Sequence, residues 1–303
     1  NGDFMKQQIK SSLILLLTAT IWGVAFVAQS VGMEYIGPFT FNAIRCVLGG
    51  LVLIPVILVL KKKKETGAEN QEKEDKKTLW AGGIACGVIL CIASNLQQFG
   101  IMEASVGKSG FFTALYIVMI PVIGIFIGKR PGIKLWFCVA LAVVGMYLLC
   151  MKDGSFTIER ADIMLLLCAL AFSFHILVVD YFSPKVDGVK MSCIQFFVCG
   201  VLSAVGMLFT ETPDISNIQA AWLPLLYAGL LSCGVGYTLQ IVGQKGINPV
   251  IASLIMSLES VISALAGWVI LGQVLSPKEI LGCVLMFVAI IITQIPIGNK
   301  KTD

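Results

Sequence analysis

The chain has 303 residues, of which 57% are hydrophobic and 13% are charged, and its mean hydropathy is +0.90. Soluble domains are about 45–50% apolar and roughly 25% charged, so this composition excludes an ordinary soluble protein and indicates one embedded in a membrane. The net charge of +4 reflects basic residues in short segments between apolar runs and implies no nucleic-acid partner.

Apolar runs long enough to cross a bilayer recur along the chain. A hydrocarbon core about 30 Å thick requires roughly 20 mostly apolar residues per helix, because backbone groups must form their hydrogen bonds within the segment. Ten such runs occur, at residues 11–31, 38–60, 79–101, 106–127, 133–151, 161–181, 188–209, 220–243, 247–271 and 279–297. The sequence therefore predicts an all-α polytopic membrane protein with ten transmembrane helices.

Basic residues fall mostly on one side of these ten helices, as expected for cytoplasmic segments. With the N-terminus inside, seventeen basic residues are internal: Lys6, Lys10, Lys61, Lys62, Lys63, Lys64, Lys73, Lys76, Lys77, Lys129, Arg130, Lys134, Lys185, Lys190, Lys245, Lys300 and Lys301. Four are external: Lys108, Lys152, Arg160 and Lys278. We therefore expect both termini to be cytoplasmic, in a bacterial inner membrane.

Cysteine and histidine usage indicates no metal site and no cofactor. All ten cysteines fall within the predicted helices, and none forms a CxxC pair. Cysteine in such surroundings is usually a small apolar packing residue. The chain has a single histidine, so it lacks the histidine clusters that bind metals.

Short phrases recur at nearly constant spacing, which predicts an internal duplication. The stretch NLQQFG at 95–100 is echoed by TLQIVG at 238–243, 143 positions later. LLLTATIW from Leu15 is echoed by LLLCALAF from Leu165, an offset of 150 that also pairs Arg45 with Gln195. We predict two repeats, 11–151 and 161–297, with cytoplasmic tails at 1–10 and 298–303.

Each predicted repeat has five helices, and five is an odd number. The second repeat must therefore enter the membrane from the opposite side, which makes the two repeats inverted copies of one another. Inverted repeats that exchange conformations move a central site between the two faces of the membrane. The sequence thus indicates alternating access rather than a static scaffold.

Small residues at a spacing of four predict close helix contacts. Gly83 with Gly87 forms a GxxxG pair, and Ser232 with Gly236 repeats the spacing. Such pairs let helices approach closely, either within one bundle or between subunits. We favour packing within the bundle, and the sequence leaves open a monomer or a homodimer.

The stretch SLESVISALAGWVILGQVLSPKEILGCVLMFVAIIITQ resembles the last helices of the drug/metabolite transporter superfamily, EamA type. The first half has the counterpart TALYIVMIPVIGIFIGKRPGIKLWFCVALAVVGMYLL, and TATIWGVAFVAQ is similar to the opening helix of that family. The resemblance implies two five-helix repeats and a secondary carrier of small metabolites, often an exporter, with a central cavity. Two departures are Gln273, where the family often has an acidic residue, and Ser260, where it often has proline.

Ionisable side chains within the predicted helices are few, and such residues usually face a cavity or a partner. Glu259 lies about midway along the ninth helix, where it is a candidate to exchange a proton or to pair with a cationic substrate group. The alternative is a permanent ion pair or a bond to backbone. Arg45 is a candidate for binding a carboxylate or phosphate, or for locking two helices together. His175 is a candidate proton relay, although packing is favoured for a lone histidine.

Polar and aromatic residues near these charges complete the predicted substrate site. The candidates are Trp22, Asn42, Asn95, Gln97, Tyr116, Gln195, Tyr237, Gln240 and Trp268. Aromatic residues near membrane surfaces are commonly anchors instead.

We therefore predict a secondary transporter, not an enzyme, for a small polar or zwitterionic metabolite such as an amino acid, an amine or a nucleobase-like molecule. The expected partners are that small-molecule substrate and membrane lipids. Proton coupling or exchange would drive transport, and export is favoured. The alternative is a passive channel or facilitator, although the sequence has no repeated filter or ring of like charges.

Overall fold

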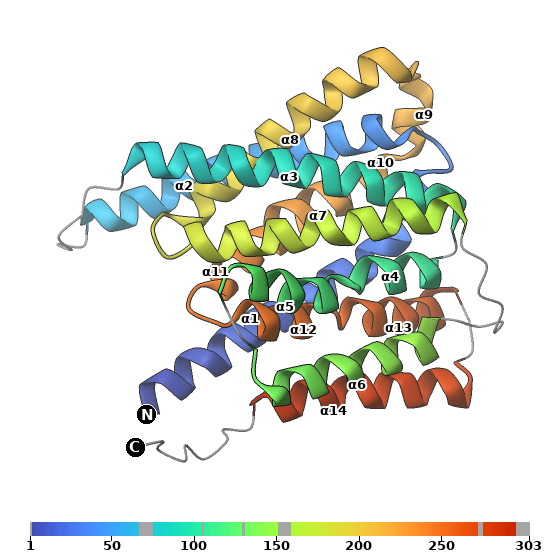
Figure 1. Cartoon of the computed structure of the whole chain (residues 1–303). Helices are drawn as coiled ribbons and strands as arrows, with labels where there is room; N and C mark the ends of the chain where they lie inside the picture. Colours follow the sequence, from blue (N-terminus) through green and yellow to red (C-terminus); the bar gives the residue numbers. More distant parts are fainter. Residues whose placement is uncertain are drawn as a thin grey trace.

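In the computed structural model the chain is described at residues 2–66, 75–104, 106–128, 131–150, 159–271 and 275–294, and these ranges contain helices and turns but no strand. The helices of the first half (Figure 1) are α1 (Gly2–Gly32), α2 (Pro38–Thr66), α3 (Lys76–Glu103), α4 (Val106–Ala114), α5 (Tyr116–Phe126) and α6 (Ile133–Cys150). Those of the second half are α7 (Arg160–Phe182), α8 (Gly188–Thr210), α9 (Ile215–Ala220), α10 (Trp222–Leu226), the π-helix η1 (Tyr227–Tyr237), α11 (Thr238–Gln244), α12 (Pro249–Met256), α13 (Glu259–Leu271) and α14 (Pro277–Gln294).

Each predicted run coincides with one of these helices or with consecutive helices. In the described ranges eight stretches are long and apolar enough to cross a membrane: Lys6–Gly32, Pro38–Lys62, Lys76–Glu103, Ser109–Phe126, Arg160–Phe182, Gly188–Thr210, Trp222–Gln244 and Pro249–Ala266. The shorter apolar stretch Ile133–Leu149 lies in α6. The predicted all-α polytopic fold is confirmed. The segment predicted as an N-terminal tail is helical from Gly2, whereas the tail predicted at 298–303 lies outside the described residues.

The two halves of the chain run in opposite directions. In Figure 1, α1 leads away from the end of the molecule where the chain begins, and α7 leads back toward that end. The second helices of the two halves, α2 and α8, pack against each other, and so do the last helices, α6 and α14. The contact of α3 with α7 has its counterpart in the contact of α1 with η1 and α11. Exchanging the halves maps this packing onto itself, as two inverted five-helix repeats predict. The residue limits of the repeats stay predictions.

Matching positions in the two halves lie in equivalent parts of the bundle. We call two residues matching when the repeat offset relates them, 150 in the first two helices of each half and 143 to 144 in the next two, where Gln97 pairs with Gln240 and Gly128 with Gly272. A five-residue turn, 33–37, joins α1 to α2, and another, 183–187, joins α7 to α8. Leu15 and Leu165 are both buried, as are Arg45 and Gln195. The duplicated phrases thus occupy equivalent places.

Polar side chains define where several helices begin. The Asp75 carboxylate accepts hydrogen bonds from the hydroxyl of Thr78 and the backbone N–H of Lys77, and these bonds hold the pKa of Asp75 below its usual value. Such capping satisfies N–H groups that have no partner within the helix. Helix α2 is capped from a distance, because Glu211, just after α8, accepts from the backbone N–H groups of Phe39 and Thr40.

Glycines permit the closest helix contacts inside the bundle. A Cβ added at Gly83 would lie 2.5 Å from Ile194 of α8, and one added at Gly87 would lie 2.6 Å from Val198. The GxxxG pair of α3 therefore packs within this chain, against α8.

Candidate functional site

A small cavity lies where the two halves meet, and both halves contribute to its walls. Its volume is about 30 Å³, room for a few water molecules at most, whereas sites for small molecules usually measure about 300–1,000 Å³. Its described lining residues are Trp22, Phe26, Gln29, Arg45, Gln97, Thr113, Tyr116, Phe172, Ile176, Ser232, Tyr237, Gln240 and Glu259. The space between these side chains is therefore too small for a metabolite in this structure.

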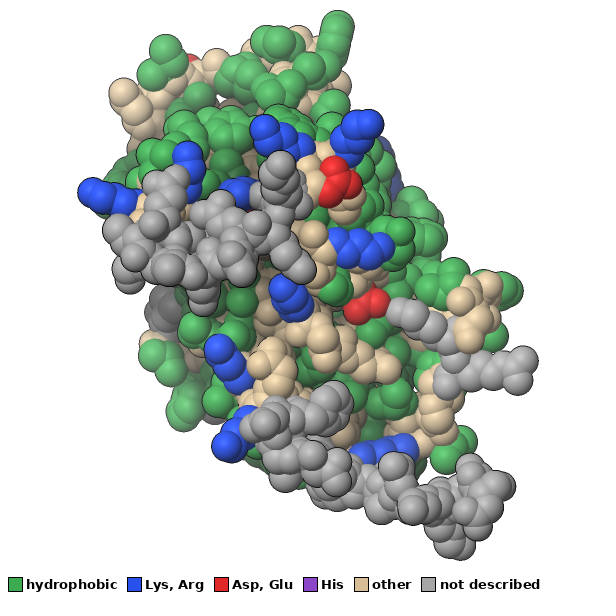
Figure 2. Space-filling model, turned by 90° about the vertical axis from the view of Figure 1, so that its left-hand side faces the viewer, with side chains coloured by type: hydrophobic (Ala, Val, Ile, Leu, Met, Phe, Trp, Pro, Cys, Tyr) green, Lys and Arg blue, Asp and Glu red, His purple; other side chains and the backbone are tan. Residues whose placement is uncertain are grey.

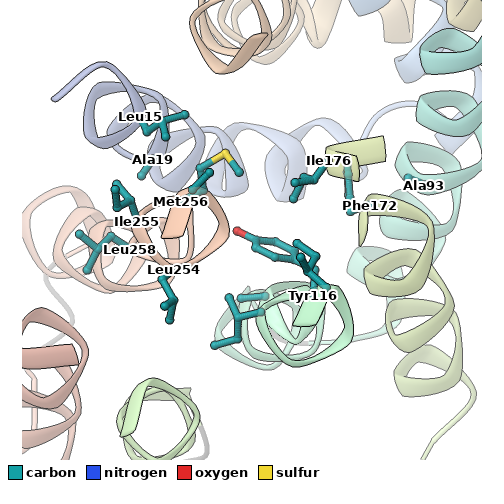
Figure 3. Packing of buried hydrophobic residues seen from close by; sticks show 14 of the residues in the cluster. Leu15, Ala19, Ala93, Tyr116, Phe172, Ile176, Leu254, Ile255, Met256 and Leu258 are labelled. Carbon is teal, nitrogen blue, oxygen red and sulfur yellow. The ribbon is translucent and has the colours of Figure 1, made fainter. Parts of the chain in front are cut away.

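Seven of the twelve predicted site residues line this cavity, namely Trp22, Arg45, Gln97, Tyr116, Tyr237, Gln240 and Glu259. Arg45 is 2% exposed and Glu259 is 4% exposed, so both ionisable groups are withdrawn from the surface. Figure 3 shows the hydroxyl of Tyr116 pointing from α5 toward Met256 of α12 and the neighbouring part of α1. The predicted roles of these residues in binding stay predictions.

Arg45 has no acidic partner. Its Nη1 donates to Oε1 of Gln29 at 3.1 Å, which joins α2 to α1, and its Nε has no hydrogen-bond partner. Among the residues that the structure describes, no carboxylate lies within ion-pair distance of the guanidinium. Phe41 lies 5.7 Å from the guanidinium carbon, measured to the ring centroid. Arg45 thus links α2 to α1 through Gln29, whereas its Nε remains without a partner; which of its two predicted roles applies stays a prediction.

Glu259 begins α13 and receives a hydrogen bond from across the cavity. The Tyr116 hydroxyl donates to Oε1 of Glu259 at 3.1 Å, and no other donor to this carboxyl occurs in the described ranges. The contact joins α5 of the first half to α13 of the second. It is neither the ion pair nor the backbone bond considered as alternatives for Glu259.

Aromatic rings form one side of the cavity around Tyr237. The Tyr237 ring centroid lies 4.6 Å from that of Trp22 and 5.8 Å from that of Phe196. Edge-to-face and tilted pairs of this kind are favourable because the ring edge is positive and the face negative. His175 makes a further edge contact with Tyr237, at 6.0 Å between centroids. The wall that Tyr237 presents is therefore held in place from behind.

The π-helix η1 is tied to α1 by three hydrogen bonds to backbone carbonyls. Trp22 Nε1 donates to Ser232 O at 3.3 Å, and Thr18 Oγ1 donates to Gly236 O at 3.4 Å. In the other direction the Tyr227 hydroxyl donates to Ile21 O at 3.0 Å. A Cβ at Gly236 would lie 2.7 Å from Trp22 Nε1, so this approach requires glycine. π-Helical turns are frequently found at functional sites, and this one includes Ser232, which lines the cavity.

The two duplicated glutamines differ in their bonding. Gln240 donates to Gln244 at 3.1 Å, and Gln244 donates to Ile176 O at 2.9 Å. Gln97 lines the cavity and makes no hydrogen bond to any described residue. The Oε1 atom of Gln240 is buried without a partner. Both side chains therefore present unused amide atoms near the cavity.

The other five predicted site residues lie outside the cavity lining. Asn42 donates to Asn95 at 2.9 Å, and Asn95 donates to Ser203 at 3.0 Å, which links α2, α3 and α8. His175 and Gln195 hydrogen-bond to each other at 3.0 Å, so the packing alternative describes His175 in this structure. Trp268 is 50% exposed and faces away from the core.

Six lining residues were not predicted: Phe26, Gln29, Thr113, Phe172, Ile176 and Ser232. Gln29 carried a usable signal, because an amide within the first apolar run is as unusual as the amides that were selected. Phe172 lies at the position matching Trp22, so the duplication also pointed to it. Phe26, Thr113, Ile176 and Ser232 gave no signal that separates a lining residue from a packed one.

Comparisons with known proteins extend over nearly the whole chain. The sequence profile of the EamA-like transporter family matches residues 9–151 and again residues 159–295. An uncharacterized transporter of Archaeoglobus fulgidus is 27% identical over 302 residues, 97% of this chain and 91% of that protein. The threonine/homoserine exporter RhtA of Escherichia coli is 23% identical over 288 residues, 92% of this chain and 90% of that protein. A crystal structure with 17% identity superposes with a TM-score of 0.76, covering 94% of this chain and 96% of that one, so the fold is shared.

Proposed function

The chain belongs to the EamA-like transporter family, and on that premise we propose that it carries a small zwitterionic metabolite across the membrane by alternating access. The proposed substrate class is an amino acid, and export is the proposed direction. Proton coupling through Glu259, or exchange of one solute for another, drives the movement.

A buried guanidinium without an acidic partner is the observation that carries this proposal. A charged side chain within a bilayer is unfavourable by about 2.5–3.5 kcal/mol on insertion scales, and such residues usually face a substrate path or a partner. Arg45 lines the cavity and lacks a described carboxylate partner. Its planar fork matches a carboxylate, which a substrate would supply. Glu259 on the same cavity supplies the complementary group for an ammonium or a proton.

Alternating access is supported by the arrangement of the halves. The cavity lies between them and, at about 30 Å³, is too small to hold a metabolite without a rearrangement. Rocking of one inverted repeat against the other opens such a central site to each face in turn. The substrate path thus needs no second binding site.

The orientation in the membrane is proposed from charge. Figure 2 looks onto the end of the molecule where α1 begins, and basic side chains gather there. Basic residues near the helix ends on this face include Lys10, Lys77, Lys134, Lys190 and Lys245. Cytoplasmic loops collect lysine and arginine, so we place this face, and both termini, in the cytoplasm of a bacterial cell. Labelling of single cysteines introduced at the two ends tests the assignment, and termini on different faces would contradict it.

Transport of chemically matched probes tests the substrate class. The purified protein is reconstituted into proteoliposomes that contain L-threonine, and exchange of this internal L-threonine for labelled external L-threonine is measured. L-Threonine is chosen because one relative is named a threonine/homoserine exporter. N-Acetyl-L-threonine lacks the ammonium and L-threoninol lacks the carboxylate, so neither should compete. A panel of other amino acids extends the test to the whole class. Ohmic currents through single molecules in a bilayer would contradict a carrier.

Replacement of the carboxyl tests the role of Glu259. The titratable groups that share the cavity with it are Tyr116, Tyr237 and Arg45, whose reference pKa values are about 10 or higher. We expect Glu259→Gln to abolish the dependence of transport on pH between 5 and 8, while the exposed control Glu34→Gln keeps it. Unchanged pH-dependent transport by Glu259→Gln would rule out the proposed role.

A further inference from the structure

The hydrogen bond between Tyr116 and Glu259 joins two matching positions. The two residues are 143 positions apart, the same offset that relates Gln97 to Gln240. A contact between two matching positions, one from each half, lies at or near the axis that relates the halves. When the two halves exchange conformations, Tyr116 takes the place of Glu259 and Glu259 that of Tyr116. The distance between the two side chains is therefore the same before and after the exchange. This bond, unlike contacts away from the axis, can persist in inward-facing and outward-facing forms.

The closed cavity leaves Glu259 no alternative donor. Tyr116 is 3% exposed and Glu259 is 4% exposed, and no other described group donates to this carboxyl. When the cavity is open to either face, water can hydrate Glu259. In this structure the cavity beside Glu259 measures only about 30 Å³, and a carboxyl buried to this degree without a hydrogen bond is strongly disfavoured.

We propose that Tyr116 is a positioning residue that satisfies Glu259 while the empty carrier passes through its closed form, and that it yields Glu259 to the ammonium of the cargo when the carrier is loaded. This inference rests on the proposed function. The cavity holds a solute only after it has widened. The Tyr116 hydroxyl and the ammonium of the cargo therefore contact the Glu259 carboxyl alternately, never at the same time. Tyr116 thereby governs how fast the carrier returns empty.

The two modes of transport depend on Tyr116 differently. Net efflux requires the empty carrier to return, whereas exchange of one cargo molecule for another does not. Tyr116→Phe keeps the ring and removes only the hydroxyl, so the closed empty form loses the donor to Glu259. We expect net efflux to slow by about 5- to 100-fold, as for a buried group left without its partner. Exchange should stay within about twofold of the wild type.

The experiment measures both fluxes in the same proteoliposomes. Labelled L-threonine inside is released into buffer without substrate for net efflux, and into buffer with unlabelled L-threonine for exchange. The readout is the rate of exchange divided by the rate of net efflux. A general loss of folded protein lowers both rates in proportion, so it does not raise this ratio. Tyr227→Phe is the matched control, because it removes a hydroxyl bonded to Ile21 O of the same bundle but outside the cavity lining. Its ratio should equal that of the wild type.

A second variant protects the test against a folding defect. Glu259→Asp keeps the charge but shortens the side chain by one methylene, which moves the carboxylate away from the Tyr116 hydroxyl. This variant should therefore also raise the ratio of exchange to net efflux. Parallel loss of both fluxes in Tyr116→Phe, or an unchanged ratio in either variant, would overturn the inference. Failure of the proposed function would show itself separately, as an absence of amino-acid flux in the wild-type protein.

Discussion

The contact of α1 with η1 and the contact of α7 with α3 occupy matching places in the two halves, yet their chemistry differs. Thr18 and Trp22 of α1 donate to carbonyls of the second half. The matching residues of α7, Cys168 and Phe172, have side chains that pack as apolar groups. The helix beside α1 is a π-helix over Tyr227–Tyr237, whereas α3 is α-helical throughout. Duplication thus sets where the helices lie, whereas their winding and their polar contacts differ between the halves.

The same lesson applies to the polar pairs within each half. Arg45 of α2 bonds to Gln29 of α1, and Gln195 of α8 bonds to His175 of α7. Arg45 and Gln195 match at an offset of 150, and each joins the second helix of its half to the first. Only the first pair lines the cavity. The residues proposed for substrate binding are therefore found where the halves depart from one another.

The largest effect is expected from Arg45→Gln. This change removes the difference between Arg45 of α2 and its match in α8, Gln195, because both positions then carry glutamine. Hydrogen bonds to charged groups contribute about 1.5–3 kcal/mol, so kcat/KM for L-threonine should fall by about 10- to 100-fold. The preference for L-threonine over L-threoninol should vanish, because the carboxylate loses its partner.

The matched control is Gln195→Ala. It leaves His175 without its hydrogen bond and should lower the free energy of unfolding by about 1–3 kcal/mol, measured as a fall in Tm in detergent. Its preference for L-threonine over L-threoninol should be retained. Equal loss of preference in both variants would show that position 45 has no special role.

Much of the fold was accessible from the sequence because bilayer physics leaves few alternatives. Each apolar run had to be a helix, since no other segment satisfies its backbone in lipid. The echo of Leu96, Gln97 and Gly100 in Leu239, Gln240 and Gly243 marked equivalent places. The π-helix was not predicted, because its apolar sequence has no pattern that separates it from an α-helix, and the bond from Trp22 to Ser232 O joins residues 210 positions apart.

The candidate site was only partly accessible. Arg45 and Glu259 stood out because charge in an apolar run is costly, and both line the cavity. Asn42 and Asn95, chosen as polar residues within apolar runs, bond to each other elsewhere in the bundle. A helix that is apolar on every face carries no periodic signal for its rotation about its own axis. Sequence therefore identifies polar residues in the membrane without showing which way they point.

An intermediate effect is expected from Trp22→Phe, which makes α1 resemble α7 at this position. The change removes the bond from Nε1 to Ser232 O and should lower the free energy of unfolding by about 1 kcal/mol. Faster amide hydrogen exchange in η1 should accompany the fall in Tm. The exposed Trp80→Phe serves as control and should change neither. If η1 exchanged at the wild-type rate in Trp22→Phe, the link between this donor and the π-helix would be wrong.

The smallest effect is expected from Thr18→Val, which replaces a hydroxyl by a methyl group of similar size. The bond from Thr18 to Gly236 O is long, at 3.4 Å, and the hydroxyl also bonds to Ile14 O of its own helix. Thr20→Val is a matched control, because Thr20 is exposed and bonds only to Leu16 O of its own helix. The difference in Tm between the two variants therefore isolates the contact with η1, to which we assign about 0.5 kcal/mol. Equal Tm values would leave Trp22 and Tyr227 as the side chains that hold η1 against α1, and would make Thr18 equivalent to its apolar counterpart Cys168.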